Sequence, residues 1–205
     1  MVYMKEFMTD VDICDWMTEL LTMMRLVLDS PIYDENWFIM LNFQSKIYQK
    51  TIQQLLPVIT RTNDTTALQE FFRFAVSFIT QKCLQPENYT TRFRVGGFEG
   101  ASSDLRSLMS QSALDTWQLM DPDIKQLPIF SPELIPVIIQ GTFVTDKLSK
   151  QAFYNILFEI FSTKNSLFVA DSPGEGTVLE FVLRALDMFL DARYYGKNCH
   201  YRGFF

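Results

Sequence analysis

Apolar residues recur every three or four positions along most of this chain, which is the spacing of one face of an α-helix. The first such stripe ends at Ser30 and Pro31. Its opposite face carries Asp15, Glu19 and Arg25. The pattern therefore predicts a first helix whose apolar face packs against the rest of the protein. The stripe consists of Ile13, Trp16, Met17, Leu20, Met24, Val27 and Leu28.

Capping residues and prolines predict where the next two helices begin and end. Asp34 is expected to cap a second helix, which Pro57 kinks or stops. Thr66 and Gln69 have the spacing of a capping box, so a third helix is expected to begin there. Pro86 closes that helix.

Serine and threonine residues predict the beginnings of the later helices. Ser102 and Ser103 are expected to cap a fourth helix. Ser131 is expected to cap a fifth, which Gly141 ends. Thr145 is then expected to begin a sixth helix.

A last helix is expected from about residue 175 to residue 195, with an apolar face that stays partly uncovered. Phe153 and Phe181 lie in the middle of apolar stripes and are expected to be buried. The uncovered face is the candidate interaction surface of the chain. Its members are Val178, Phe181, Val182, Leu186 and Phe189.

These patterns predict an all-α protein of about seven helices with no convincing strand. Short connections favour antiparallel neighbours, so both a bundle and a stacked array of helical hairpins remain open. Residues 1–205 are expected to form a single segment. Residues 1–84 hold the first helices, residues 85–103 form a glycine-containing loop, and residues 104–205 hold the later helices.

Composition narrows the classes of function. The net charge of −6, from 18 basic and 24 acidic side chains, argues against binding to a nucleic-acid backbone. The longest uncharged run, residues 134–145, has twelve residues and is too short to span a bilayer. The first residues lack the apolar core of a signal peptide, so a cytoplasmic protein is expected.

Candidate catalytic groups are few. His200 is the one histidine, and it adjoins Cys199, but neighbouring side chains on an ordered element point apart. The glycine-rich residues 96–103 lack the lysine of a phosphate-binding loop and are interpreted as a connector. No catalytic residue and no cofactor is therefore expected.

The carboxylates and cysteines are also interpreted as structural residues. Asp10, Asp12 and Asp15, like Asp121 and Asp123, are interpreted as helix-start acids and solvated faces, because the calcium-loop pattern is not met. The three cysteines are Cys14, Cys83 and Cys199. Their odd number and wide spacing predict buried thiols without a disulfide or a metal ion.

Several ordered blocks of sequence resemble the Dock (dedicator of cytokinesis) family. The first two are residues 35–44, ENWFIMLNFQ, and residues 71–89, FFRFAVSFITQKCLQPENY. Residues 129–138, IFSPELIPVI, and the helix of residues 152–161 resemble a later part of the same family. The resemblance covers about residues 35 to 195.

The resemblance implies a helical-repeat region, an armadillo-like superhelix of stacked antiparallel hairpins, just before the exchange domain of a Rho-family guanine-nucleotide exchange factor. It implies a scaffold without exchange activity of its own, because the catalytic exchange domain is absent from this chain. The Rac-activating branch is preferred, although residues 92–101 depart from the basic stretch of the family.

The implied partners are the neighbouring domains of the parent factor, a Rho-family GTPase bound through that parent, and an Elmo-type adaptor. The implied setting is cytoplasmic signalling to the cytoskeleton in cell migration, with membrane recruitment through the parent and no direct membrane insertion. The alternative function is a free-standing helical adaptor that binds a protein partner. A small-molecule enzyme is disfavoured, because no base, nucleophile or metal set converges.

Overall fold

The computed structural model contains seven α-helices and no strand in the part of the chain that it describes. It describes residues 9–30, 32–34, 37–85, 102–125 and 130–164, together with residues 183, 186 and 187. The helices are α2 (Asp10–Asp29), α3 (Phe38–Thr62), α4 (Thr65–Ile79), α6 (Ser102–Leu119), α7 (Pro122–Lys125), α8 (Phe130–Thr142) and α9 (Lys147–Lys164), with a 3₁₀ turn η1 (Lys82–Leu84) after α4.

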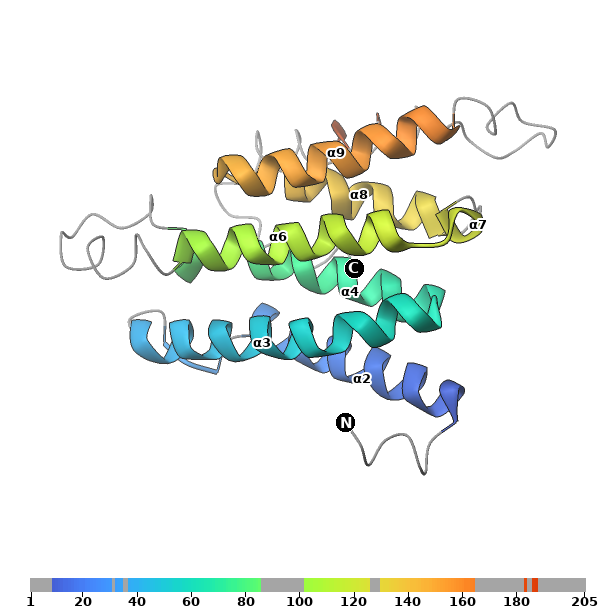
Figure 1. The fold of residues 1–205 in the computed structure, drawn as a ribbon. Helices are drawn as coiled ribbons and strands as arrows, with labels where there is room; N and C mark the ends of the chain where they lie inside the picture. The colour runs from blue at the N-terminus through green and yellow to red at the C-terminus, as the bar shows by residue number, and fades with distance from the viewer. Residues whose placement is uncertain are drawn as a thin grey trace.

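The long helices form three antiparallel hairpins, α2–α3, α4–α6 and α8–α9, which stack in two layers (Figure 1). In one layer α2 packs against α4, and α4 packs against α8. In the other layer α3 packs against α6, and α6 packs against α9. The predicted all-α fold of stacked helical hairpins is therefore confirmed, and a closed bundle is not formed.

Helix α4 lies at the centre of the stack. Of its fifteen residues ten are buried, and it contacts α2, α6 and α8. A helix that is apolar on nearly every side is stable only when other helices surround it. The buried residues are Ala67, Leu68, Glu70, Phe71, Phe72, Phe74, Ala75, Val76, Phe78 and Ile79.

The connection between α3 and α4 differs from the sequence prediction. Asp64, not Thr66, caps α4, because its carboxylate accepts a hydrogen bond of 2.7 Å from the backbone N–H of Ala67. The preceding Asn63 ends α3 in the left-handed conformation, with φ of 49°. Asparagine tolerates this conformation, so the chain turns earlier than the capping-box spacing indicated.

Three other predicted caps were also displaced. Trp37, not Asp34, precedes the first turn of α3, and no side chain caps that helix. Helix α8 begins at Phe130, which leaves Ser131 inside the helix. Asp146, not Thr145, caps α9, since its carboxylate accepts a 2.8 Å hydrogen bond from the backbone N–H of Ser149.

The predicted loop is shorter than residues 85–103. Helix α6 begins at Ser102, so Ser102 and Ser103 lie within the helix and not at the position before it. Residues 86–101 lie outside the described residues, and the division of the chain into parts stays a prediction.

Two expected helix breakers lie inside helices. Pro57 does not stop α3, which continues to Thr62. Pro57 is exposed, so its missing N–H costs one helical hydrogen bond without crowding the core. Gly141 does not end α8, which runs to Thr142. A Cβ atom at Gly141 would lie 2.6 Å from the ring of Phe153, so the glycine lets α8 approach α9 closely.

We expect Gly141→Ala to destabilise the protein by about 1–3 kcal/mol, because the added methyl group overlaps the ring of Phe153. Urea unfolding followed by circular dichroism measures the change. In a Phe153→Ala background the same substitution should cost much less, since the methyl group enters vacated space. Equal costs in both backgrounds would show that the close approach does not determine the effect.

The core runs through all three hairpins. Phe153 is fully buried, as the sequence predicted, whereas Phe181 lies outside the described residues. The first predicted stripe is also confirmed as the packed face of α2. Its buried members are Ile13, Met17, Met24 and Leu28, and its half-buried members are Trp16, Leu20 and Val27.

Candidate functional site

The interaction surface predicted on the last helix is described only at one position. Leu186 is half-buried and packs against the core. The other members, Val178, Phe181, Val182 and Phe189, lie outside the described residues. The interaction surface there stays a prediction.

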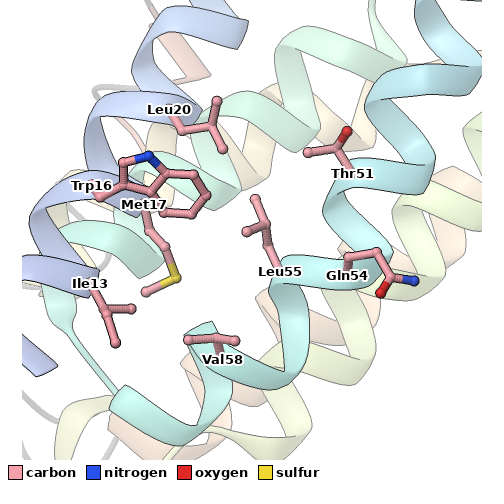
Figure 2. A pocket seen from close by; sticks show the side chains of 8 residues that line it. All are labelled: Ile13, Trp16, Met17, Leu20, Thr51, Gln54, Leu55 and Val58. Carbon is pink, nitrogen blue, oxygen red and sulfur yellow. The ribbon is translucent and has the colours of Figure 1, made fainter. Parts of the chain in front are cut away.

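A groove lies between α2 and α3, in the first hairpin of the stack (Figure 2). It has a volume of about 210 Å³. Met17 is fully buried and Leu55 nearly so, while Trp16 and Leu20 are half-buried. The lining residues are Ile13, Trp16, Met17 and Leu20 from α2, and Thr51, Gln54, Leu55 and Val58 from α3.

The spacing of these residues explains how the groove forms. On each helix the lining residues recur at the three- and four-residue spacing of a single face. Thr51 and Gln54 are the two polar residues of the lining, and the rest are apolar. An apolar groove between two helices can accept the apolar side chains of a third helix.

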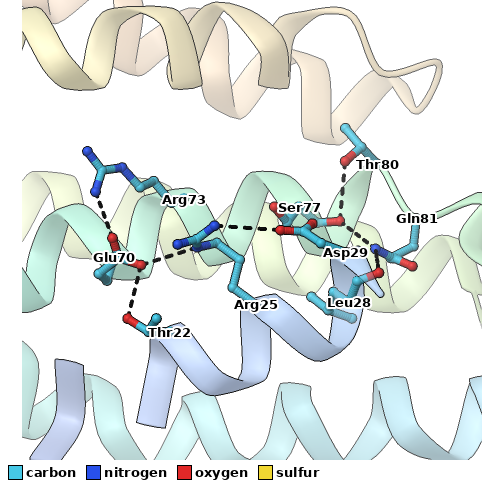
Figure 3. Close-up of polar contacts among 9 residues, drawn as sticks. All are labelled: Thr22, Arg25, Leu28, Asp29, Glu70, Arg73, Ser77, Thr80 and Gln81. Carbon is cyan, nitrogen blue, oxygen red and sulfur yellow. Dashed lines mark hydrogen bonds and ion pairs between the residues drawn. The ribbon is translucent and has the colours of Figure 1, made fainter. Parts of the chain in front are cut away.

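A polar cluster joins α2 to α4 (Figure 3). The carboxylate of Glu70, a residue only 7% exposed, lies 3.2 Å from Arg25 Nε of α2 and 2.6 Å from Arg73 Nη1 on its own helix. Thr22 donates a hydrogen bond of 3.3 Å to the same carboxylate. Arg25 also lies 3.5 Å from Asp29, one turn further along α2.

The position of Arg25 corrects the sequence prediction, which placed it on the solvent face with Asp15 and Glu19. Both acidic residues are exposed, but Arg25 turns toward α4 and is half-buried. At the end of α2 the side chain of Gln81 donates a 3.1 Å hydrogen bond to the carbonyl of Leu28. These contacts fix the position of α2 along α4.

We expect Glu70→Gln to destabilise the protein by roughly 1–2 kcal/mol, because it removes the charge that both arginines face while solvent still reaches their guanidinium groups. Chemical denaturation measures the change. The control is Glu159→Gln, whose carboxylate is 2.8 Å from Lys125 but 41% exposed, so a loss below about 1 kcal/mol is expected. A larger loss at Glu159 than at Glu70 would contradict this ranking.

A second buried polar contact links the segment that follows α4 to the segment that precedes α9. Arg106 of α6 is 3% exposed and donates a hydrogen bond of 2.7 Å to the side chain of Gln85. Its guanidinium also lies 3.5 Å from the hydroxyl of Thr145, which precedes α9. The segment after α4 and the segment before α9 therefore meet on α6.

The candidate chemical groups have structural roles where the structure describes them. Asp12 forms a capping box with Thr9, and the hydrogen bonds from Thr9 lower the pKa of its carboxyl group. Asp121 accepts a 3.0 Å hydrogen bond from the N–H of Asp123 at the first turn of α7. Their interpretation as helix-start acids is confirmed.

The cysteines differ from one another. Burial raises the pKa of the Cys83 thiol to about 11, against a smaller opposite effect of a hydrogen bond with Ser45. Cys83 is buried as predicted, whereas Cys14 is only half-buried. Cys199, His200 and residues 96–101 lie outside the described residues.

The described helices offer neither a metal-binding cluster nor a membrane-spanning segment. Within this part of the chain, no three histidine, cysteine or acidic side chains gather where a metal ion could bind. None of the described helices is both long and apolar enough to cross a membrane.

The two features that the fold assembles, the groove and the Glu70 cluster, were not predicted from the sequence. The α2–α3 groove needs two helix faces to be paired, and the Glu70 cluster joins residues 45 positions apart. The one sequence signal was Glu70, which like Arg73 is a charged residue among the apolar residues of this helix, since such a residue is rarely buried without a partner.

Comparison with known proteins agrees with this architecture. Residues 1–168 match the family model of the dedicator of cytokinesis (DOCK) TPR region, which covers most of the chain. No solved structure matches the chain. The stack of helical hairpins and the length of the family match together show that this chain belongs to the DOCK family, in its TPR region.

Proposed function

We propose that the chain is a scaffold and interaction segment of a DOCK-family guanine-nucleotide exchange factor for Rho-family GTPases of the Rac type. The observation that carries this proposal is the stack of three hairpins, in which helix pairs repeat along one direction (Figure 1). Such a stack holds the parts of a protein at its two ends at a set distance from each other.

Apolar surface at the described ends of the stack supports a role in binding neighbouring domains or other proteins. The α2–α3 groove lies in the first hairpin. In the last hairpin, Leu148, Tyr154 and Phe158 of α9 are exposed, and Phe158 is 75% exposed. Exposed apolar surface of this kind is typical of interfaces. The proposed partners are the neighbouring domains of the parent factor and an Elmo-type adaptor, with a Rho-family GTPase bound through the parent.

The proposed setting is cytoplasmic, with recruitment to a membrane through the parent factor, in cytoskeletal signalling during cell migration. The same proposal includes the interaction face on the last helix, which would contact the next part of the parent factor. This face consists of Val178, Phe181, Val182, Leu186 and Phe189.

We expect the isolated chain not to accelerate nucleotide release from any Rho-family GTPase. Exchange requires groups that displace the magnesium ion and phosphates of the bound nucleotide, and the family match is to the TPR region of these proteins, which is a helical segment without exchange chemistry. A fluorescent-nucleotide release assay with Rac measures it at micromolar protein. The control is a chain extended downstream into an exchange domain, which should accelerate release. Acceleration by the isolated chain would overturn the scaffold assignment.

The alternative is a free-standing helical adaptor, which the α2–α3 groove favours because it offers a binding surface without any neighbouring domain. A pull-down with nucleotide-free Rac separates the two functions. If the downstream extension is needed for capture, the scaffold function is supported. If a protein partner binds the short chain as tightly as the extended one, the adaptor function is favoured.

A further inference from the structure

The hydroxyl group of Thr145 is held beside a buried arginine. Thr145 lies in the short connection between α8 and α9, and it is exposed. Its Oγ1 atom lies 3.5 Å from Nη1 of Arg106, a residue of α6 that is only 3% exposed. The same hydroxyl group donates a hydrogen bond of 3.3 Å to Oε1 of Gln85. An enzyme can therefore reach this hydroxyl group, while the fold fixes a cation next to it.

The side chains around this hydroxyl group carry more positive than negative charge. Lys147 and Lys150 lie on the first turn of α9, directly after Thr145, so together with Arg106 they supply three cations. Asp146 supplies one carboxylate, which already accepts a 2.8 Å hydrogen bond from a backbone N–H of α9. Among these four side chains, the balance of charge favours an added anion.

We propose that Thr145 is a phosphorylation site, and that the phosphate binds Arg106 and ties α9 to α6. In the reaction, Oγ1 of Thr145 bonds to the γ-phosphorus of ATP on a serine/threonine kinase, and the bond from that phosphorus to the bridging oxygen of ADP breaks. The hydroxyl proton passes to the catalytic base of the kinase, and ADP leaves. Lys147, two residues after the acceptor, indicates a kinase that selects a basic residue at this position.

The position of Arg106 suits a phosphate better than a hydroxyl group. A phosphothreonine carries nearly two negative charges at neutral pH and three acceptor oxygens. These oxygens lie two bonds beyond Oγ1, so they reach the guanidinium group, whose planar fork can donate two parallel hydrogen bonds. The positive N-terminal end of α9 adds to this attraction. Repulsion from Asp146 opposes it, but with one charge against three.

The phosphate would strengthen the contact between two hairpins. Arg106 belongs to the α4–α6 hairpin, and it donates a 2.7 Å hydrogen bond to Gln85, which follows α4. Thr145 belongs to the α8–α9 hairpin. Phosphorylation therefore adds a charged link where the hydroxyl group of Thr145 now makes a neutral one. The proposal concerns regulation of the stack, so it goes beyond the scaffold function and does not depend on it.

Phosphate mapping on the full, folded chain tests whether Thr145 is an acceptor. The probe is ATP with a serine/threonine kinase that selects a basic residue two positions after the hydroxyl group, and mass spectrometry locates the phosphate. Thr145 should be modified, whereas Thr142, which is 6% exposed, should not. Lys147→Gln should lower the rate of modification at least about fivefold, and an unchanged rate would overturn the kinase assignment. Absence of phosphate from Thr145 would overturn the whole proposal.

Thermal unfolding followed by circular dichroism then tests the role of Arg106. A chain made with phosphothreonine at position 145 should melt about 2–6 °C higher than the unmodified chain. In an Arg106→Gln background the phosphate should raise the melting temperature by less than half as much, since the main cation is absent. Arg106→Lys keeps a cation without the planar fork, so it should also reduce the gain, and it replaces Arg106→Gln if that variant does not fold.

Phosphoserine at position 162 is the matched control, because Ser162 is exposed on the last turn of the same helix. There the phosphate should not raise the melting temperature, since a negative charge near a helix C-terminus is unfavourable. If the phosphate at Thr145 lowers the melting temperature, or raises it equally in the wild type and in the Arg106 variants, the proposal is wrong.

Discussion

Phe153→Ala should lower the free energy of unfolding by about 3–5 kcal/mol, the range for removing a large aromatic side chain from a packed core. Phe153 is fully buried in α9, and its ring contacts α8 at Gly141. The alanine leaves a cavity there, because a glycine has no side chain with which to fill it. Urea unfolding monitored by circular dichroism measures the loss.

The matched control is Phe158→Ala on the same helix. Phe158 is 75% exposed, so its removal should change the stability by less than about 0.5 kcal/mol. If Phe153→Ala cost under about 1 kcal/mol, the packing of α9 on α8 would not be a main source of stability.

Trp117→Ala should have a comparably large effect, again about 3–5 kcal/mol. Trp117 of α6 is 2% exposed, and its ring meets that of Phe72 edge to face with the centroids 5.9 Å apart. The amine of Lys125 lies 5.4 Å from the centre of the same indole. The substitution therefore removes a contact between α6 and α4 and a cation–π contact with α7.

Trp117→Phe should cost much less than Trp117→Ala. The indole N–H is buried, and it has no hydrogen-bond partner in the part of the chain that the structure describes, so phenylalanine loses volume but no hydrogen bond. Trp37→Ala is the second control, because Trp37 is 59% exposed. Equal losses for Trp117→Phe and Trp117→Ala would show that the indole has a polar role.

The helices themselves could be predicted because their apolar residues recur at a regular interval. The stripe from Ile13 to Leu28 contains enough apolar residues that α2 follows from spacing alone. The choice of a stack over a bundle could not be made from that spacing, since both architectures bury one face of each helix. It depends on which helices pair, and no sequence repeat marks the pairs.

The helix boundaries were harder to predict, because several capping residues compete within one turn. Asp64 and Thr66 can each accept a backbone hydrogen bond, and the left-handed Asn63 decides between them. The sequence predicts a helix end at Gly141, whereas the actual role of this glycine depends on a phenylalanine twelve residues later. The conformational preference of glycine gives no information about such a contact between two helices.

The contacts that assemble the candidate site depend on tertiary structure. Arg25 and Glu70 belong to different hairpins, and α2 must lie on α4 before their charges can meet. Likewise, Trp16 and Val58 line one groove only because α2 and α3 fold back on each other. Sequence spacing predicted the buried faces, but not which of them would remain partly open.

The burial of α4 on nearly every side determines how the chain unfolds. When an apolar helix at the centre of a stack loses either neighbouring hairpin, the interface with that hairpin is lost and the newly exposed apolar surface raises the free energy of the partly unfolded form. Peeling off the α8–α9 hairpin would expose apolar residues of α4, and so would peeling off α2–α3. We therefore expect the described hairpins to melt together as a single cooperative unit, with a half-folded chain as a minor species.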